Sequence, residues 1–236
     1  MNMIRTTPQT VSTNADVLAL ATAGAAEGLW LRAEQQTGGR GRMGRDWESP
    51  PGNLYVSTLV RLRPGDPAAA TLGFVAALAL HEIAALYAPD AVMQIKWPND
   101  VMANGAKLSG ILLERTGDAV VVGIGVNLAS HPDLPDRKTT SIAALTGIAP
   151  DARFFLEGLT EVFQPLLSSW RGAGLPALLN RWRAAAHTVG TALKVSLPDG
   201  TAVDGSYDGL GDDGALRLRL ADGTVRVIHA GDVFLV

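Results

Sequence analysis

The sequence has 236 residues, of which 47% are hydrophobic and 18% are charged, and its formal net charge is −3. This length and composition are typical of a folded protein with one large core, or with a main domain and a small second one. The slightly acidic balance argues against general affinity for nucleic acid or a membrane surface, and the absence of cysteine excludes disulfides and thiolate metal sites.

The first part of the sequence predicts a helix and two strands. No apolar stretch occurs in the first nine residues, so no signal peptide is expected. Residues 13–23 have helical spacing and begin with a capping-box-like pair, Thr13 and Asp16. Residues 28–34 and 53–61 alternate like strands, and we expect them to be antiparallel neighbours joined by a long loop.

The middle of the sequence predicts a buried helix, more strands and a second helical region. Residues 68–80 form the most apolar segment, which is shorter than the roughly 20 residues that span a bilayer. We therefore expect a buried helix with Pro67 at its first position and its end near Leu86. Further strands are expected at 92–97, 107–114 and 119–128, with a turn at 98–100, a polar loop at 130–140 and two helices within 151–185.

The hydrophobic pattern of the sequence changes after His187. Short alternating segments follow, and the Asp-Gly pairs between them are strong signals of hairpin turns. About 50 residues of this pattern predict a small β-barrel. We therefore expect an α+β fold with a main domain at 1–186, built on a mixed sheet flanked by helices, and a barrel domain at 187–236.

The loop between the first two strands contains GGRGRMGR at residues 38–45, with four glycines and three arginines. It matches the dinucleotide-binding pattern G-x-G-x-x-G, but that fold needs a helix directly afterwards, and Pro50 and Pro51 forbid one. It also resembles a P-loop, but Arg45 and Asp46 stand where lysine and serine or threonine are required. Neither nucleotide-binding motif is therefore present.

A loop of this kind suits anion binding, because backbone N–H groups and arginine side chains can converge on one anion. It is about 17 residues long, and long loops inside a compact domain are usually functional. With few apolar anchors, we expect it to be mobile until the anion binds. The alternative is a solvated charged loop.

Two further features carry charge at the ends of predicted strands. Residues 96–100 (KWPND) place a lysine and a tryptophan before a proline turn. This pattern alone is as consistent with a turn that only carries polar side chains as with a binding site. Lys107 begins a strand in which Gly110 permits the close approach of a ligand, although a lone lysine is more often simply solvated.

Together these segments are similar to bacterial biotin protein ligases, the biotin–[acetyl-CoA-carboxylase] ligases. The resemblance covers about residues 12–128, where each block alone is weak and the ordered set is specific. Its blocks are STN, EQQTGGRGRMGRDW, NLYVS, KWPNDV, KLSGILLE and GIGVNL, in this order.

The resemblance implies a catalytic domain related to class II aminoacyl-tRNA synthetases and lipoate ligases, followed by a barrel of the Src-homology-3 type. It implies that biotin and ATP, with Mg²⁺ as part of the ATP complex, form biotinyl-5′-AMP, which then acylates a lysine of a biotin carboxyl carrier protein. No tightly bound prosthetic group is expected. Alternatives are a lipoate–protein ligase and a non-catalytic biotin-binding protein.

The resemblance also implies a cytoplasmic enzyme that binds neither DNA nor a membrane. Some family members carry an N-terminal winged helix, but only eleven residues precede Ser12, so a form without that repressor domain is expected. A homodimer is left open.

The resemblance assigns roles to individual residues. Catalysis falls to Lys107, Arg40 and Arg42, whose charges would neutralise the reacting carboxylate and phosphate. Biotin binding falls to Ser12, Thr13, Asn14, Gln36, Arg40, Gly41, Arg42, Lys107 and Gly110. ATP binding falls to Arg42, Arg45, Lys96, Trp97, Asn99, Asp100 and Asn127, with Asp100 as a magnesium ligand. For Ser12, Thr13 and Asn14, helix capping alone is the alternative, and both roles are compatible.

Overall fold

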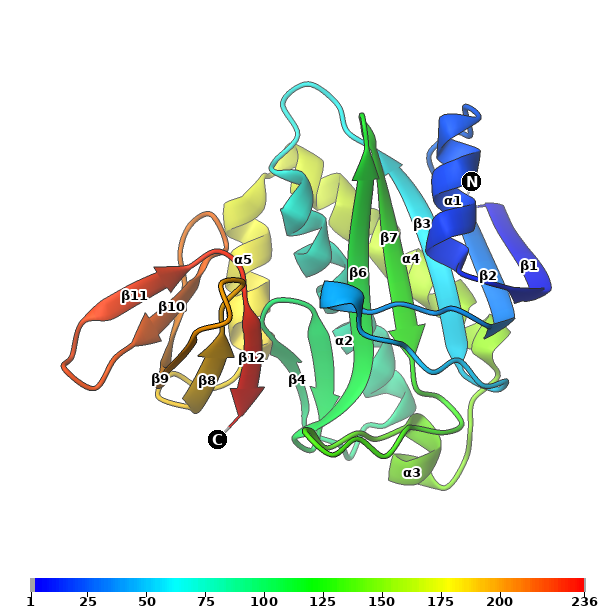
Figure 1. The fold of residues 1–236 in the computed structure, drawn as a ribbon. Coiled ribbons are helices and arrows are strands. Elements are labelled where there is room, and N and C mark those ends of the chain that lie inside the picture. Colours follow the sequence, from blue (N-terminus) through cyan, green and yellow to red (C-terminus); the bar gives the residue numbers. More distant parts are fainter. Residues whose placement is uncertain (1–2, 236) are drawn as a thin grey trace.

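The computed structural model describes residues 3–235, which form a seven-stranded sheet, a five-stranded sheet and five α-helices (Figure 1). The large sheet has the order β1-β2-β3-β7-β6-β5-β4, and β1 with β2 is the parallel pair among otherwise antiparallel neighbours within these residues. Helix α1 lies on one face, and α2 with α4 and α5 covers the other. The predicted α+β class is confirmed.

The strands of the large sheet are β1 (Met3–Thr10), β2 (Leu29–Gln36), β3 (Leu54–Arg61), β4 (Met93–Lys96), β5 (Asp100–Ala103), β6 (Ala106–Thr116) and β7 (Ala119–Val126). The helices are α1 (Thr13–Thr22), α2 (Leu72–Tyr87), α3 (Ile142–Thr146), α4 (Ala152–Gly172) and α5 (Leu175–Ala185). The small sheet has β8 (Ala192–Ser196), β9 (Ala202–Leu210), β10 (Leu216–Arg219), β11 (Val225–Ile228) and β12 (Asp232–Leu235).

Helix α1 begins with a different cap from the one predicted. Ser12 is the N-cap, and its hydroxyl accepts a hydrogen bond from the backbone N–H of Ala15 at 3.5 Å. Asp16 is therefore one position too far along to close a capping box, and it accepts a hydrogen bond from Thr10 of β1 at 2.6 Å instead. The predicted pair of Thr13 and Asp16 was wrong, whereas the predicted helix is confirmed.

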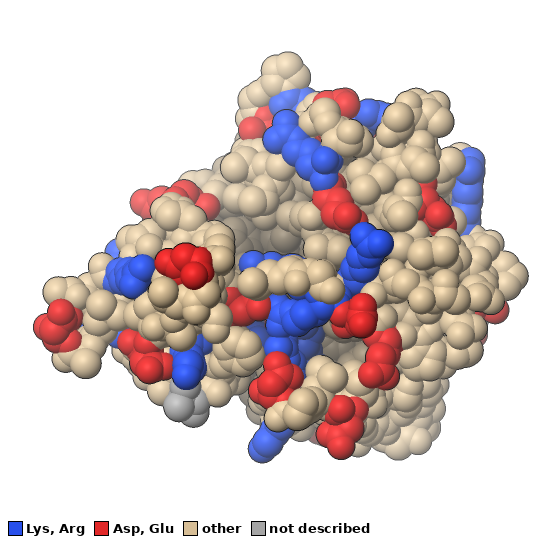
Figure 2. All heavy atoms as spheres, viewed as in Figure 1, with Lys and Arg blue, Asp and Glu red and all other residues tan. Residues whose placement is uncertain are grey.

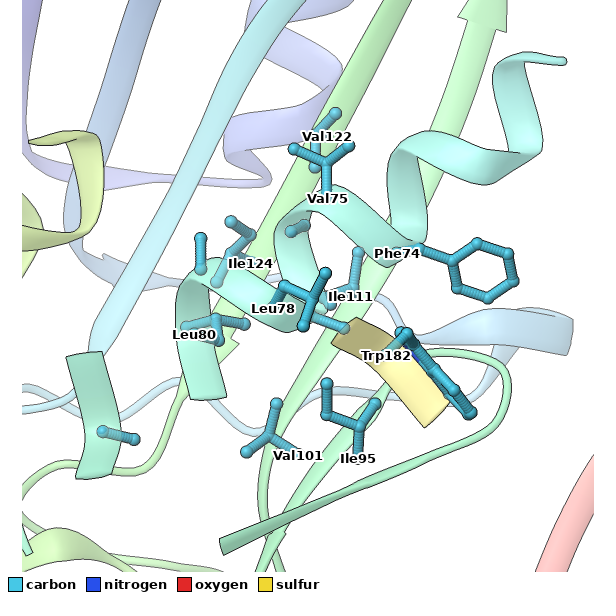
Figure 3. Packing of buried hydrophobic residues seen from close by; sticks show 14 of the residues in the cluster. Phe74, Val75, Leu78, Leu80, Ile95, Val101, Ile111, Val122, Ile124 and Trp182 are labelled. Carbon is cyan, nitrogen blue, oxygen red and sulfur yellow. The ribbon is translucent and has the colours of Figure 1, made fainter. Parts of the chain in front are cut away.

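Helix α2 is the centre of the core. The predicted start at Pro67 was wrong, because residues 69–71 form a short 3₁₀ turn and α2 begins at Leu72. The helical stretch Ala69–Tyr87 has 19 residues, so by length and composition it could cross a membrane, but 67% of its apolar 18-residue window is buried inside the protein. In Figure 3, Val75 and Leu78 point toward the strands that carry Ile111 and Val122, with which they share one buried cluster.

Two strands of the large sheet were missed. Residues 3–10 are mostly polar and largely exposed, so their strand conformation comes from pairing with β2 rather than from any alternating pattern. Strand β5 begins inside the predicted turn at 98–100, and all four of its residues are buried. Its short length hides the alternation that would have indicated a strand.

The C-terminal sheet has the order β11-β10-β9-β8-β12 and lies beside α5 and the β4 edge of the large sheet. The indole of Trp97 donates a hydrogen bond to the carbonyl of Gly214 at 3.0 Å, and Gly214 lies against the ring of Phe74. One buried cluster runs without a break from α2 into the barrel residues Leu216 and Leu218. The division at residue 186 stays a prediction.

Candidate active site

All of the site residues predicted from the sequence line one cavity of about 330 Å³. Its walls come from the start of α1, the glycine- and arginine-rich loop (residues 37–53), the strands β4 to β7, the polar loop at 130–140, and β12. Figure 2 shows basic side chains gathered in the middle of this face, with acidic side chains beside them. Segments far apart in the sequence therefore converge here.

A buried carboxylate holds two lysines at the centre of the cavity. Asp100 lies 2.7 Å from the Nζ of Lys107 and 2.9 Å from the Nζ of Lys96. Burial alone would raise the pKa of Asp100, but the two ammonium groups hold it well below its usual range. Burial lowers the pKa of Lys107, and Asp100 partly offsets that effect. Two cations on one anion leave an excess positive charge facing the cavity.

The Asp100 cluster bears on the predicted magnesium site. One oxygen of Asp100 faces each ammonium group, so a metal ion there would have to displace a lysine. Within residues 3–235, no group of three or more His, Cys, Asp or Glu side chains is arranged to hold a metal ion. The residues described therefore do not form a metal site by themselves.

The glycine- and arginine-rich loop adopts a defined, self-bonded conformation. The N–H of Trp47 donates to the carbonyl of Gly39 at 3.0 Å, and the N–H of Gly41 donates to that of Arg45 at 2.7 Å. A side chain at residue 39 would collide with the carbonyl of Trp47, since its Cβ would lie 2.5 Å away. Met43 takes the left-handed conformation, with φ of 56°. The loop can therefore present its arginines from a short, tight turn.

Two of the three arginines of this loop share a carboxylate partner, and the third has none among the described residues. Arg42 donates to Asn99 at 3.3 Å and to the carbonyl of Gly231 at 3.1 Å, and it lies 3.5 Å from Asp232. Arg45 also pairs with Asp232. Burial lowers the pKa of Arg42, and Asp232 partly opposes that shift. Arg40 is exposed and makes no ion pair within the part of the chain that the structure describes.

Trp47 ends the block EQQTGGRGRMGRDW and lines the cavity, although the sequence analysis gave it no role. Its indole lies across Gly110 and Gly125, which face each other in β6 and β7. A Cβ at Gly125 would come within 2.5 Å of the ring and one at Gly110 within 3.0 Å. The Nζ of Lys107 lies 5.4 Å from the ring centroid. The sequence signal for this contact was the pair Gly123 and Gly125, two residues apart on the buried strand β7, because glycines there permit the close approach of another group.

The start of α1 forms the opposite, less charged end of the cavity. Gln36 accepts hydrogen bonds at its Oε1 from the N–H of Thr13 at 2.8 Å and from the hydroxyl of Thr13 at 3.1 Å. Its amide nitrogen donates to Ser49 at 3.1 Å. Ser12 caps α1 and lines the cavity as well, so both of its expected roles fit the geometry.

Two predicted residues support the walls. Asn127 donates from its amide to the carbonyl of Thr140 at 3.0 Å, which ties down the polar loop. The indole N–H of Trp97 donates to the carbonyl of Gly214 and so joins this wall to the barrel. Other lining residues were not predicted because they lie beyond residues 12–128, which carry the resemblance: Asp136 and Arg137 in the polar loop, and Asp232 and Val233 in β12.

The comparisons with known proteins agree with this arrangement. Residues 7–128 match the biotin/lipoate A/B protein ligase family, and residues 191–236 match the biotin protein ligase C-terminal domain. The chain is 41% identical to the biotin–[acetyl-CoA-carboxylase] ligase of Paracoccus denitrificans, over 96% of this chain and 98% of the relative. It is 39% identical to the ligase of the same name from Mycobacterium tuberculosis, over 95% of this chain and 86% of the relative.

A solved structure gives the same result. The biotin protein ligase from Aquifex aeolicus in complex with biotin and ATP matches with a TM-score of 0.87 and 25% identity, covering 100% of this chain and 99% of the other. The expected ligase fold and C-terminal barrel are therefore confirmed. The chain belongs to the biotin/lipoate A/B protein ligase family, as one of its biotin protein ligases.

Proposed function

We propose that this chain is an ATP-dependent biotin protein ligase that binds biotin and ATP in the cavity described above. The observation that carries the proposal is the convergence of Arg40, Arg42 and Lys107 on one cavity, from two segments far apart in the sequence. The curated relatives with which it aligns over nearly its whole length are biotin–[acetyl-CoA-carboxylase] ligases. Biotin and ATP are substrates, and Mg²⁺ enters as part of the ATP complex.

The first half-reaction joins two anions. A carboxylate oxygen of biotin attacks the α-phosphorus of ATP, an oxygen–phosphorus bond forms, and the bond to pyrophosphate breaks. Negative charge grows on the phosphoryl oxygens, so the enzyme must neutralise this charge and position the two substrates, and it need not supply a nucleophile. Lys107, Arg40 and Arg42 serve this purpose, and one well-placed donor of this type contributes about 10²–10³ in rate.

Biotin is assigned to the end of the cavity beside α1. Its ureido ring offers N–H donors and a carbonyl acceptor, which short hydroxyl and amide groups can match. The side chains assigned to this end are Ser12, Thr13, Asn14 and Gln36, together with the backbone at Gly41 and Gly110.

ATP is assigned to the end formed by the loop arginines and β4–β5, through Arg42, Arg45, Lys96, Trp97, Asn99, Asp100 and Asn127. Asp100 as a magnesium ligand stays a prediction. Its two oxygens hold Lys96 and Lys107, and that cluster supports a role in orienting the ammonium groups. The magnesium ion would then be held chiefly by the phosphates of ATP.

The second half-reaction transfers biotin to a protein. The neutral amine of the acceptor lysine attacks the acyl carbon of biotinyl-5′-AMP, an amide forms, AMP leaves, and the lysine nitrogen loses a proton. The names of the relatives identify acetyl-CoA carboxylase as their target, and the acceptor proposed here is its biotin carboxyl carrier domain or that of a related carboxylase. A cytoplasmic location and the absence of DNA and membrane binding stay predictions, and the sequence makes no prediction for or against a homodimer.

Pyrophosphate release tests this function. The purified chain is incubated with MgATP and either biotin, lipoate or no acid, and pyrophosphate is measured. Biotin-dependent release is expected. Lipoate-dependent release would identify a lipoate ligase, and biotin binding without release would identify a non-catalytic binding protein.

The barrel is expected to contribute to the ATP site through Asp232. Asp232→Asn removes the charge that holds Arg42 and Arg45, while Val233 still accepts from Lys96 at 2.8 Å. These ion pairs are partly exposed, so the KM for ATP should rise about three- to tenfold. Steady-state pyrophosphate release measures it. Asp208→Asn is the matched control, because Asp208 pairs with Arg217 and Arg219 elsewhere in the barrel. An unchanged KM for ATP in Asp232→Asn would show that the barrel does not contribute to ATP binding through Asp232.

A further inference from the structure

The side chain of Asn14 rests on the main sheet, over a row of three strands. Ser57 of β3 and Leu112 of β6 both pair with Gly123 of β7, so the three residues form one cross-strand row. A Cβ at Gly123 would lie 2.1 Å from the Oδ1 of Asn14, so only glycine leaves room for this side chain. Asn14 is 5% exposed. Its amide is therefore buried at the edge of the cavity and needs partners.

Glu114 determines which way the amide of Asn14 faces. The Nδ2 of Asn14 donates to the Oε2 of Glu114 at 2.7 Å and lies 3.4 Å from the carbonyl of Leu112. An ionised carboxylate only accepts hydrogen bonds, so it must face the amide nitrogen and not the amide oxygen. The Oδ1 of Asn14 is consequently turned toward Ser57, at 2.6 Å.

Ser57 then has one hydrogen for two neighbours. Its Oγ lies 2.6 Å from the Oδ1 of Asn14 and 2.7 Å from the Oγ1 of Thr13. Because the Oδ1 of Asn14 carries no hydrogen, the hydroxyl of Ser57 must donate to it. Thr13 uses its own hydrogen toward Ser57 or toward Gln36. Among the contacts of the described residues, no donor is then left for the Oγ1 of Thr13, which lines the cavity.

We propose that Glu114 and Ser57 are positioning residues for the end of the site that receives biotin, acting through Asn14 and Thr13. Neither residue lines the cavity. Glu114 fixes the orientation of the Asn14 amide, whose oxygen accepts the hydrogen bond of Ser57. The Oγ1 of Thr13 is left as an acceptor for an N–H donor on the ligand. This inference rests on the proposed function, in which the ureido ring of biotin supplies that donor.

Substitutions at Glu114 separate this role from a general structural one. Glu114→Leu, which keeps the bulk but removes the acceptor, should raise the KM for biotin about ten- to hundredfold, as expected for the loss of a charge-assisted hydrogen bond. The KM for ATP and kcat should change little. Glu114→Gln, which retains an oxygen acceptor, should recover most of the biotin affinity. Biotin-dependent ATP–pyrophosphate exchange measures all three quantities.

A double-mutant cycle tests whether Glu114 acts through Asn14. In an Asn14→Ala background, Glu114→Leu should cause no further rise in the KM for biotin, because the intermediary is already absent. Glu157→Leu on the exposed face of α4 is the control and should match the wild type. If Glu114→Leu does not fold, Ser57→Ala carries the same test and should also raise the KM for biotin without changing the KM for ATP.

Three results would overturn the inference: an unchanged KM for biotin in Glu114→Leu, an additional rise in the Asn14→Ala background, or parallel losses in kcat and in the affinity for both substrates. The activity of the wild-type chain distinguishes a failure of the proposed function from a failure of this inference alone. A wild type without biotin-dependent exchange refutes the proposed function together with the inference. An active wild type with an unaffected Glu114→Leu refutes the inference alone.

Discussion

Lys107→Ala is expected to lower the rate of biotin-dependent pyrophosphate release by about 10²–10³-fold, the cost of removing one donor aimed at developing charge. The ammonium of Lys107 is nearly buried and lies 2.7 Å from Asp100, which fixes its position. In water a mobile ammonium contributes little, whereas a fixed and partly desolvated one stabilises the transition state strongly. The measurement is single-turnover pyrophosphate release at saturating biotin and ATP.

The same variant should remain folded. Removing Lys107 leaves Asp100 paired with Lys96 at 2.9 Å, so the buried carboxylate is not left without a counter-charge. Circular dichroism and thermal unfolding check this point. Lys194→Ala is the control, because Lys194 is exposed on β8 of the barrel. Pyrophosphate release at the wild-type rate in Lys107→Ala would contradict the role given to this lysine.

Arg40→Ala and Arg42→Ala are expected to release biotinyl-5′-AMP into solution. Arg42 joins the loop to Asn99 and to β12, and Arg40 has its guanidinium free for an anion within the described residues. The intermediate is a reactive mixed anhydride, so a closed loop protects it from water until the acceptor lysine arrives. Loss of either arginine should speed its escape by about ten- to hundredfold, the effect of one charge-assisted hydrogen bond.

Filtration of the enzyme after one turnover, followed by quantification of free biotinyl-5′-AMP, measures this escape. Arg153→Ala is the control, since Arg153 is exposed on α4 and pairs only with Glu157 among the contacts described. A variant that retains the intermediate as well as the wild type would show that its arginine does not hold the adenylate. Arg42→Ala should have the larger effect, because it also unties the loop from the barrel.

The charge pattern of the cavity has a simple consequence for ligand binding. Asp100 holds Lys96 and Lys107, and Asp232 holds Arg42 and Arg45. Two carboxylates therefore neutralise about half of the charge of four cations, which lowers the cost of burying them and leaves positive charge for an anionic ligand. Salt screens the attraction between this remaining positive charge and an anionic substrate, so substrate binding should weaken as ionic strength rises.

Local patterns in the sequence were sufficient for the helices, for most strands and for the cationic side chains of the site. Strand and helix periodicity reports which positions face the core, and glycine and proline mark turns, because both effects act between near neighbours. The ordered motifs GGRGRMGR, KWPND and KLSGILLE supplied the cationic residues Arg40, Arg42, Arg45, Lys96 and Lys107 of the cavity. The chemistry of the site, a set of cations beside short polar groups, therefore follows from the amino-acid sequence alone.

Only the tertiary structure decided which of these groups meet, and at what distance. Arg42 reaches a carbonyl 189 residues away in the barrel, Trp47 covers a glycine on β7, and Asn14 bridges to Glu114 across 100 residues. The strand conformation of β1 likewise depends on its partner β2. Periodicity encodes whether a position is buried but not what it is buried against, so contacts between distant segments emerge only when the whole chain packs.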